Sequence, residues 1–121
     1  MSKKLILAVV GVALSVPLAA EAHHGWAWTT GENIQLTGKV TSVKLGNPHG
    51  IVNMDVEGVS WRLEVGPPSR NQRAGLKNDD LAEGIVLKVD GEPSRDPAEK
   101  RLKVERLWIG DQLYVLYPDR S

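Results

Sequence analysis

The sequence predicts an all-β fold, a small Greek-key barrel of the OB-fold type with five to six strands and one short helix between strands three and four. Apolar and polar residues alternate over several segments of residues 34–117, which is the pattern of strands with one buried face. The segment with helix-end signals follows the third of these strands, where the five-stranded barrel carries its bridging helix. No internal repeat or linker divides the chain. A β-sandwich of similar length is the alternative, but it does not normally need the helix.

The first predicted strand, residues 34–45, changes its buried face partway along. Its apolar residues occupy even-numbered positions up to Val40 and odd-numbered positions from Val43 on. A bulge or irregularity within residues 38–42 would cause this change, as when one strand serves both halves of a curled sheet.

Residues 52–65 predict a β-hairpin whose two-residue turn is Glu57–Gly58. Apolar residues alternate with polar ones on both sides of the turn, so one face is expected to be buried and the other wet. This alternation places Met54 and Trp61 inside and Glu64 on the solvent-facing side.

Residues 66–76 interrupt the strand pattern and predict a short helix. Ser69 followed by Gln72 has the spacing of a capping box, and Gly75 lies where the helix would end.

The rest of the chain predicts three more strands. The fourth, over residues 85–89, is expected to end at Asp90–Gly91, with the sequence DGEPSRDP forming a hairpin tip. The fifth and sixth strands lie within residues 101–117 and pair around Gly110–Asp111. Trp108 is expected in the core.

The first 22 residues have the three parts of a secretory signal. Lys3 and Lys4 are followed by an apolar run, Leu5–Leu18, and by the small residues at both ends of Ala20–Ala22. The run is shorter than the roughly 17 to 25 residues that span a membrane. We therefore expect a cleaved signal peptide rather than an uncleaved anchor, a periplasmic location and no membrane span in the mature protein.

Cleavage after Ala22 would leave 99 residues that begin with His23, in one domain with a lead at 23–33 and a barrel at 34–117. Loss of two lysines and one glutamate leaves 13 basic and 14 acidic residues. The basic residues are interleaved with acidic ones, as in DPAEKRLKVER, so nucleic acid is not an expected partner. The chain has no cysteine and therefore no disulfide, and we expect a monomer.

The mature chain would contain three histidines, His23, His24 and His49. After cleavage, His23 offers its α-amine and its ring nitrogen, which together can close a chelate ring on a metal ion. With pKa values of about 8 and about 6.5, both groups release their protons to a metal near neutral pH at little cost. His24 adds an imidazole, and His49, in the turn GNPHG, adds another if the N-terminal segment folds back. We therefore expect these three histidines to be the metal ligands.

Cu(II) is the expected ion, because amine and imidazole donors in a tetragonal arrangement suit it. Zinc accepts the same ligands in a tetrahedral arrangement and is the alternative ion. Cu(I) carriers generally use sulfur donors. Met54 has the only sulfur atom of the mature chain, and its side chain is expected to be buried. The arrangement resembles a histidine brace, in which an N-terminal histidine and a second histidine hold copper, as in periplasmic copper carriers and copper monooxygenases. The resemblance covers His23 and either His49 or His24.

The same residues also fit an interpretation without metal. Two histidines at a secreted N-terminus can form a solvated tail, and His49 can be an ordinary turn residue. Trp26 and Trp28 are either an aromatic platform beside the histidines or anchors that hold the lead on the barrel, and anchoring is favoured because large aromatic side chains dominate small cores.

Three arginines, Arg70, Arg73 and Arg95, can form a small anion site, although solvated charge is the simpler interpretation. No nucleophile motif, phosphate-binding glycine loop or carboxylate pair indicates an enzyme. We expect no enzymatic activity, a copper oxidase or monooxygenase being the weaker alternative. The expected partner is a metal ion or an envelope protein. The alternative function is a metal-free binding module for a peptide, a saccharide or an envelope protein, using the loop at residues 47–50.

The motifs HHGWAW, LTGKV, NPHG, WRLEV, PPSRNQRAGL and GEPSRDP together resemble a family of small exported proteobacterial proteins of unknown function, whose mature form begins with His-His and a nearby tryptophan. The resemblance covers residues 23–117. It implies export and one compact β domain, and it assigns no catalytic residue. The positions that match its motifs are His23, His24, Trp26, Asn47, Pro48, His49, Trp61, Pro68, Ser69, Arg70 and Gly75.

Overall fold

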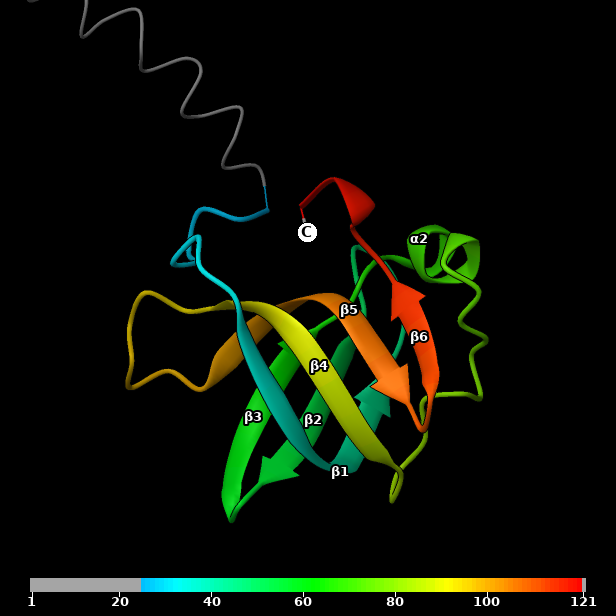
Figure 1. Cartoon of the computed structure of the whole chain (residues 1–121), viewed down its shortest axis with the longest axis horizontal. Helices are drawn as coiled ribbons and strands as arrows, with labels where there is room; N and C mark the ends of the chain where they lie inside the picture. Colours follow the sequence, from blue (N-terminus) through cyan, green and yellow to red (C-terminus); the bar gives the residue numbers. More distant parts are fainter. Residues whose placement is uncertain (1–24, 121) are drawn as a thin grey trace, which may run out of the picture.

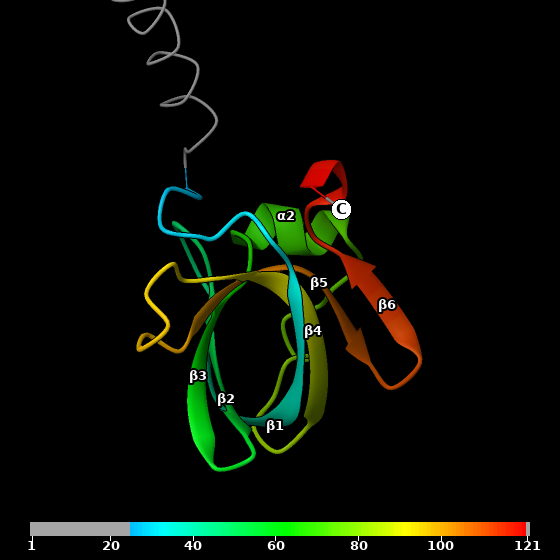
Figure 2. The same cartoon turned by 60° about the vertical axis from the view of Figure 1, so that its left-hand side comes forward.

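The structure, a computed structural model, describes residues 25–120, in which six strands form one sheet (Figure 1). The strands are β1 (Ile34–Lys44), β2 (Ile51–Val56), β3 (Val59–Glu64), β4 (Val86–Pro93), β5 (Arg101–Ile109) and β6 (Gln112–Val115). Their order is β3-β2-β1-β4-β5-β6, and a parallel pairing of β3 with β5 closes the first five into a barrel. The sixth strand extends the sheet beside β5 (Figure 2). The predicted all-β barrel of the OB-fold type is therefore confirmed.

The irregularity expected in the first strand is present. The pairing of β1 with β2 shifts register between Val40 and Ser42. The hairpin is also confirmed, because Val56 pairs with Val59 across the turn at Glu57–Gly58. The bulge allows β1 to pair with β4 through its first half and with β2 through its second half.

The short helix α2 (Pro68–Arg73) follows β3 as predicted, but the capping box is not formed. Pro67 occupies the N-cap position and no side chain caps the helix, because two prolines set its extended entry and first turn. Gly75 ends the helix as predicted, with a φ of +93° that favours glycine. The amide of Asn71 instead makes the local contact, through two hydrogen bonds with the backbone of Gly66.

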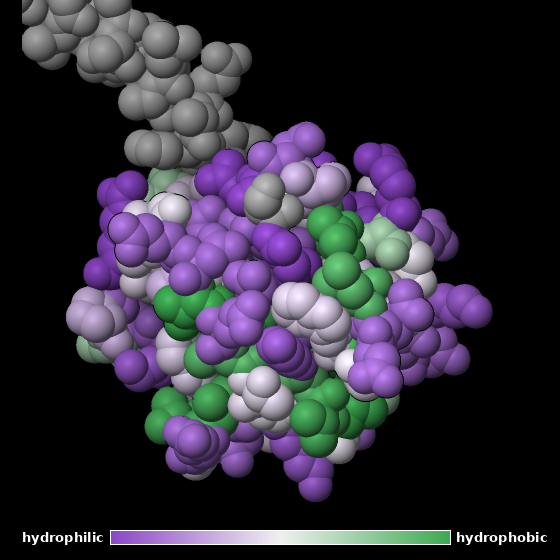
Figure 3. Space-filling model, in the orientation of Figure 1, coloured by the Kyte–Doolittle hydropathy of each residue, from purple (hydrophilic) through white to green (hydrophobic). Residues whose placement is uncertain are grey.

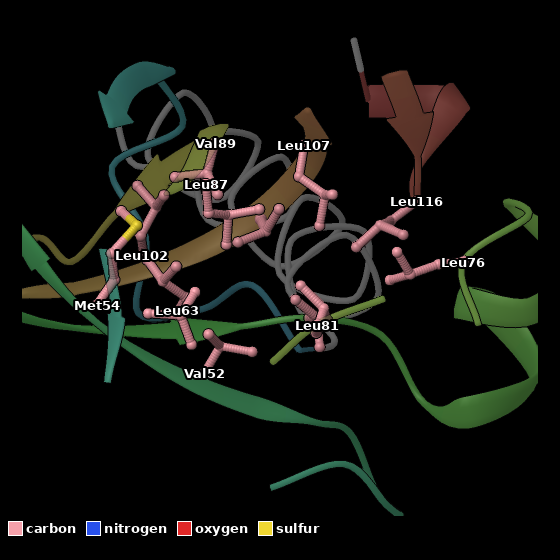
Figure 4. Close-up of a cluster of buried hydrophobic side chains, with 13 residues drawn as sticks. Val52, Met54, Leu63, Leu76, Leu81, Leu87, Val89, Leu102, Leu107 and Leu116 are labelled. Atoms are coloured by element: carbon pink, nitrogen blue, oxygen red, sulfur yellow. The ribbon is translucent and has the colours of Figure 1, made fainter. Parts of the chain in front are cut away.

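The core lies inside the barrel and consists of thirteen buried apolar residues (Figure 4). Met54 is among them, as predicted, and Trp61 packs partly buried against them. The expectation for Trp108 was wrong, because its ring lies on the outer face, where the ammonium of Lys88 approaches the ring centroid to 4.8 Å. The pairing of β4 with β5 shifts register between Asp90 and Gly91, where Glu105 is an extra residue of β5. The alternation of β5 therefore changes before Trp108, which explains the error.

Strand β4 continues past the predicted end at Asp90–Gly91 to Pro93. At this bulge a Cβ on Gly91 would collide with the backbone carbonyl of Lys103, so the close approach of β4 to β5 requires glycine. Residues that were expected to form a hairpin tip are thus part of the barrel wall.

Part of the outer wall is buried as well. Thr29 forms an isolated bridge with Ser94, and the Thr30 amide donates to the Pro93 carbonyl. The lead, residues 25–33, and the short 3₁₀ helix η1 (Pro118–Arg120) lie at the same end of the barrel (Figures 1 and 2). The prediction that Glu64 faces solvent is wrong, since this residue is 1% exposed.

The visible face of the molecule carries mostly hydrophilic residues, with hydrophobic ones in separate groups among them (Figure 3). The large hydrophobic residues that stay exposed in the described region are Ile34, Val59, Val86 and Leu113. Within residues 25–120, no helix is long and apolar enough to cross a membrane. The predicted signal peptide, residues 1–22, lies outside the described residues.

Candidate functional site

A hollow of about 550 Å³, here called the terminal hollow, lies where the lead, the β1–β2 loop, α2 and the C-terminal segment meet. This volume is in the range of small-ligand sites. Its lining residues are Gly25, Trp26, Pro48, His49, Pro67, Arg70, Lys103, Tyr117, Asp119 and Arg120.

His49 is held at the edge of this hollow by a buried carboxylate. Its Nε2 atom lies 2.9 Å from Oε1 of Glu64, and the imidazole is 27% exposed. The other oxygen of Glu64 pairs with Arg101, and Arg62 lies 3.6 Å from it. In the tautomer with its proton on Nε2, the imidazole donates a hydrogen bond to this carboxylate, and the lone pair of Nδ1 can bind a metal.

Two of the predicted metal ligands, His23 and His24, lie outside the described residues. Gly25, which follows His24 in the chain, lines the terminal hollow together with His49. The chain therefore enters the described region at the hollow that contains the third predicted ligand. Within residues 25–120, no group of three or more His, Cys, Asp or Glu side chains is placed to hold a metal ion.

The lead is fixed to the barrel by its tryptophans, as the anchoring interpretation predicts. Trp26 packs edge-to-face on Tyr117, with ring centroids 5.1 Å apart, and the guanidinium of Arg120 lies 3.9 Å from the Trp26 ring. Trp28 is covered by the guanidinium of Arg101 at 3.7 Å. These contacts combine aromatic packing with cation–π attraction.

A lysine reaches the same rings from strand β5. Lys103 is 6% exposed, and its ammonium lies 5.5 Å from the ring centroids of both Trp26 and Tyr117. Burial lowers the pKa of Lys103, opposed by the charge of Glu64 and reinforced by the cations Arg101 and Arg70. Burial also raises the pKa of Tyr117.

An acidic cluster lies beneath the lead, next to the hollow. Thr29 donates to Glu92 at 2.7 Å, Asn33 donates to Glu105 at 2.7 Å, and Arg120 lies 3.3 Å from Glu92. Asn33 also donates to Asp90. These bonds tie the lead and η1 to β4 and β5.

The pKa values of the two glutamates in this cluster are shifted in opposite directions. Burial raises the pKa of Glu105 to about 7, and a hydrogen bond to Glu92 adds to this effect while that from Asn33 opposes it. Burial alone would raise the pKa of Glu92, but hydrogen bonds from Glu105 and Thr29 and the charge of Arg120 outweigh it and leave the pKa below 4.5. The pair therefore holds one proton on Glu105 in weakly acidic solution.

Comparison with family models gives a match over most of the chain. The model described as a family of unknown function, DUF6152, matches residues 11–103. The chain belongs to this family. The match confirms the resemblance to a family of unknown function, and it spans β1 to the start of β5 of this DUF6152 chain.

Solved structures share the fold at low sequence identity. The chain is similar to a mutant of TiaS lacking its ZRD, in complex with agmatine, with a TM-score of 0.52 and 18% identity over 70% of this chain and 26% of that one. It is also similar to the S. pombe Stn1–Ten1 complex, with a TM-score of 0.50 and 19% identity over 63% of this chain and 56% of that one. The DUF6152 chain thus corresponds to about a quarter and about half of those chains. The comparison with curated proteins finds no match.

The three arginines considered as an anion site are not brought together by the DUF6152 fold. Arg70 lines the terminal hollow and donates to the carbonyl of Leu116, whereas Arg95 is exposed and donates to the carbonyl of Thr29. Arg73 is exposed on α2.

Sequence reasoning missed the buried charges of this site, which are Glu64, Glu92, Lys103 and Glu105. The available signal was the charge at alternate positions in KVER and in DGEP, on strands whose other face is apolar. That pattern is the same for a wet face and for a face covered by another segment, so it did not distinguish the two.

Proposed function

We propose that this DUF6152 protein is an exported, periplasmic metal-binding protein that binds Cu(II) through the α-amine and imidazole of His23, together with the imidazole of His49 or His24. The observation that carries the proposal is that Gly25 and His49 line the same hollow. The proposal requires the donors of His23, two residues before Gly25, to reach this hollow, and two residues of extended chain span at most about 7 Å. His49 is therefore the favoured second residue.

The contact between His49 and Glu64 supports this choice. Metal-binding imidazoles usually donate their second nitrogen to a carboxylate or carbonyl, which fixes the ring and raises its basicity. Glu64 makes this contact at 2.9 Å and is itself held by Arg101. The imidazole is thereby oriented before any ligand arrives.

The donor set favours the oxidised ion. Met54 is fully buried inside the barrel, so it cannot supply sulfur to a site at the hollow. Nitrogen donors without thiolate or thioether suit Cu(II), and zinc is the competing ion. Export rests on the signal-like residues 1–22, and cleavage after Ala22 is what would create the amine.

Calorimetry with Cu(II) on two forms of the mature chain tests the proposal. One form begins with a free His23, and the other is the same chain with its α-amine acetylated. Acetylation is a better block than a short extension, because a free amine two residues ahead of a histidine makes a copper site of its own. The free form should bind one equivalent of Cu(II) with an affinity at least about tenfold higher, because acetylation removes one strong donor from the other form. Equal affinity of the two forms would discard the proposal.

The metal-free binding module is the second candidate. A hollow of about 390 Å³ formed by residues of the β1–β2 loop, Ile51 and Arg62 supports it, since this is the loop that such a module would use. Capture of an envelope protein or saccharide that is unchanged by acetylation and by added chelator would favour the module over the copper site.

A further inference from the structure

We infer that the terminal hollow binds a small oxyanion, a carboxylate or a phosphate, through the ammonium of Lys103 and the guanidinium of Arg70. This inference goes beyond the proposed copper site and does not depend on it.

The first observation is that Lys103, a mostly buried residue at the wall of the hollow, has no acceptor for its ammonium among the described residues. Lys103 is 6% exposed, and within residues 25–120 its ammonium makes no hydrogen bond or ion pair. Glu64 and Glu92 lie opposite it on the flanking strands, but their oxygens pair with arginines and His49 instead. The rings of Trp26 and Tyr117, with centroids 5.5 Å from the ammonium, attract its charge but accept no hydrogen bond of ordinary strength. An acceptor for Lys103 can enter from the hollow that it lines.

The second observation is an arginine whose charge is not neutralised. Arg70 is stacked over Tyr117 at 4.3 Å and donates from Nη1 to the carbonyl of Leu116 at 3.0 Å. No carboxylate of the described residues lies within ion-pair distance of it. Its orientation is fixed while other N–H groups stay free, and a fixed guanidinium is well suited to carboxylate or phosphate.

The other charged residues of the hollow do not balance the positive charges of Lys103 and Arg70. Arg120 is paired with Glu92 at 3.3 Å, and its Nε lies 4.0 Å from Glu105. Asp119 is the acidic residue of the lining, against two cations that have no carboxylate partner. Pro48 and Pro67 add apolar wall beside the charges, so the hollow suits an anion that also carries carbon atoms.

Titration of the mature, metal-free chain with acetylated amine tests the inference by NMR, with the indole N–H of Trp26 as the reporter. Blocking the amine removes the copper ligand, so failure here and failure of the copper proposal are separate results. The probes are sodium phosphate and sodium benzoate, and benzamide is the neutral match of benzoate. We expect a saturable shift with at least one of the two anions and none with benzamide, and the comparison of the anions identifies the ligand class.

Lys103→Met should weaken the binding of that anion about tenfold or more, because a charge-assisted hydrogen bond is lost. Lys88→Met is the matched control, since its ammonium also lies over a tryptophan ring but outside the hollow, and it should leave the affinity unchanged. If Lys103→Met fails to fold, Arg70→Gln carries the same test. Absence of a saturable shift with both anions, equal binding of benzamide and benzoate, or unchanged affinity in the variants would overturn the inference.

Discussion

The imidazole of His49 and the carboxylate of Glu64 are joined at 2.9 Å, although they come from a loop and from the end of β3. The carboxylate is 2% exposed and is shared with Arg101, so it cannot turn toward solvent. This contact orients the one described histidine at the mouth of the terminal hollow.

Substitution Glu64→Gln should therefore weaken Cu(II) binding by about 10-fold to 100-fold, as is usual when the residue that orients a metal-binding histidine is changed. Calorimetry on the free-amine chain measures the effect. Glu99→Gln is the control, because Glu99 pairs with the same Arg101 at 3.9 Å but does not contact His49. A variant Glu64→Gln with wild-type affinity would show that the orientation of His49 does not matter.

The shared proton of Glu92 and Glu105 predicts a pH dependence of stability. The pKa of Glu105 is raised in the native state from 4.5 to about 7, so its contribution is complete below pH 4.5 and is lost as the pH rises through 7. Glu92 has a lowered pKa, and its contribution is lost only below pH 4.5. The free energy of unfolding should fall by about 2 kcal/mol between pH 5 and pH 8 on account of Glu105.

Chemical denaturation of Glu105→Gln across this range checks the prediction. The neutral amide should remove most of the fall between pH 5 and pH 8, whereas Glu83→Gln, a change at an exposed glutamate, should keep it. Parallel pH profiles of Glu105→Gln and the wild type would contradict a proton held on Glu105.

Lys103→Met should raise the stability of the ligand-free protein at pH 7 by about 1 kcal/mol. The reason is that a partly desolvated ammonium without an acceptor in the described part of the chain is replaced by an apolar side chain of similar length. Thermal unfolding measures the change, and Lys88→Met, on the exposed face, should be close to neutral. Clear destabilisation by Lys103→Met would mean that the ammonium already has a stabilising partner.

The buried amide of Asn71 should be important for the position of α2. Its Oδ1 accepts from the amide of Gly66 at 3.0 Å, and its Nδ2 donates to the Gly66 carbonyl at 2.9 Å. Asn71→Ala leaves the buried Gly66 amide without this acceptor and should cost about 1–3 kcal/mol of the free energy of unfolding. Gln72→Ala, at the neighbouring exposed position, should change it little, whereas a large loss there would restore the capping box that the structure does not show.

The barrel could be predicted from the sequence because its signals are local. The shift of apolar positions after Val40 located the bulge of β1, and Glu57–Gly58 located the hairpin turn. Gly75 marked the end of the helix. Each of these features follows from the conformational preferences of a few neighbouring residues.

The interior of the candidate site could not be predicted in the same way. Lys103 and Glu105 alternate with apolar residues, which is the pattern of a strand with one wet face. The lead and the C-terminal segment cover that face through Trp26, Tyr117 and Arg120, and contacts between distant segments leave no trace in the local pattern. His49 was predicted as a metal ligand from its residue type, and this stays a prediction. Its partner Glu64 was placed on the solvent side.

Pulsed electron paramagnetic resonance of the Cu(II)-loaded mature chain tests whether one Cu(II) ion is bound by both His23 and His49. The spectrum reports the imidazoles bound to copper through their remote nitrogens. His49→Ala should remove one imidazole coupling, and His24→Ala should remove none. A spectrum that is the same in His49→Ala as in the wild type would contradict a copper site shared between His23 and His49.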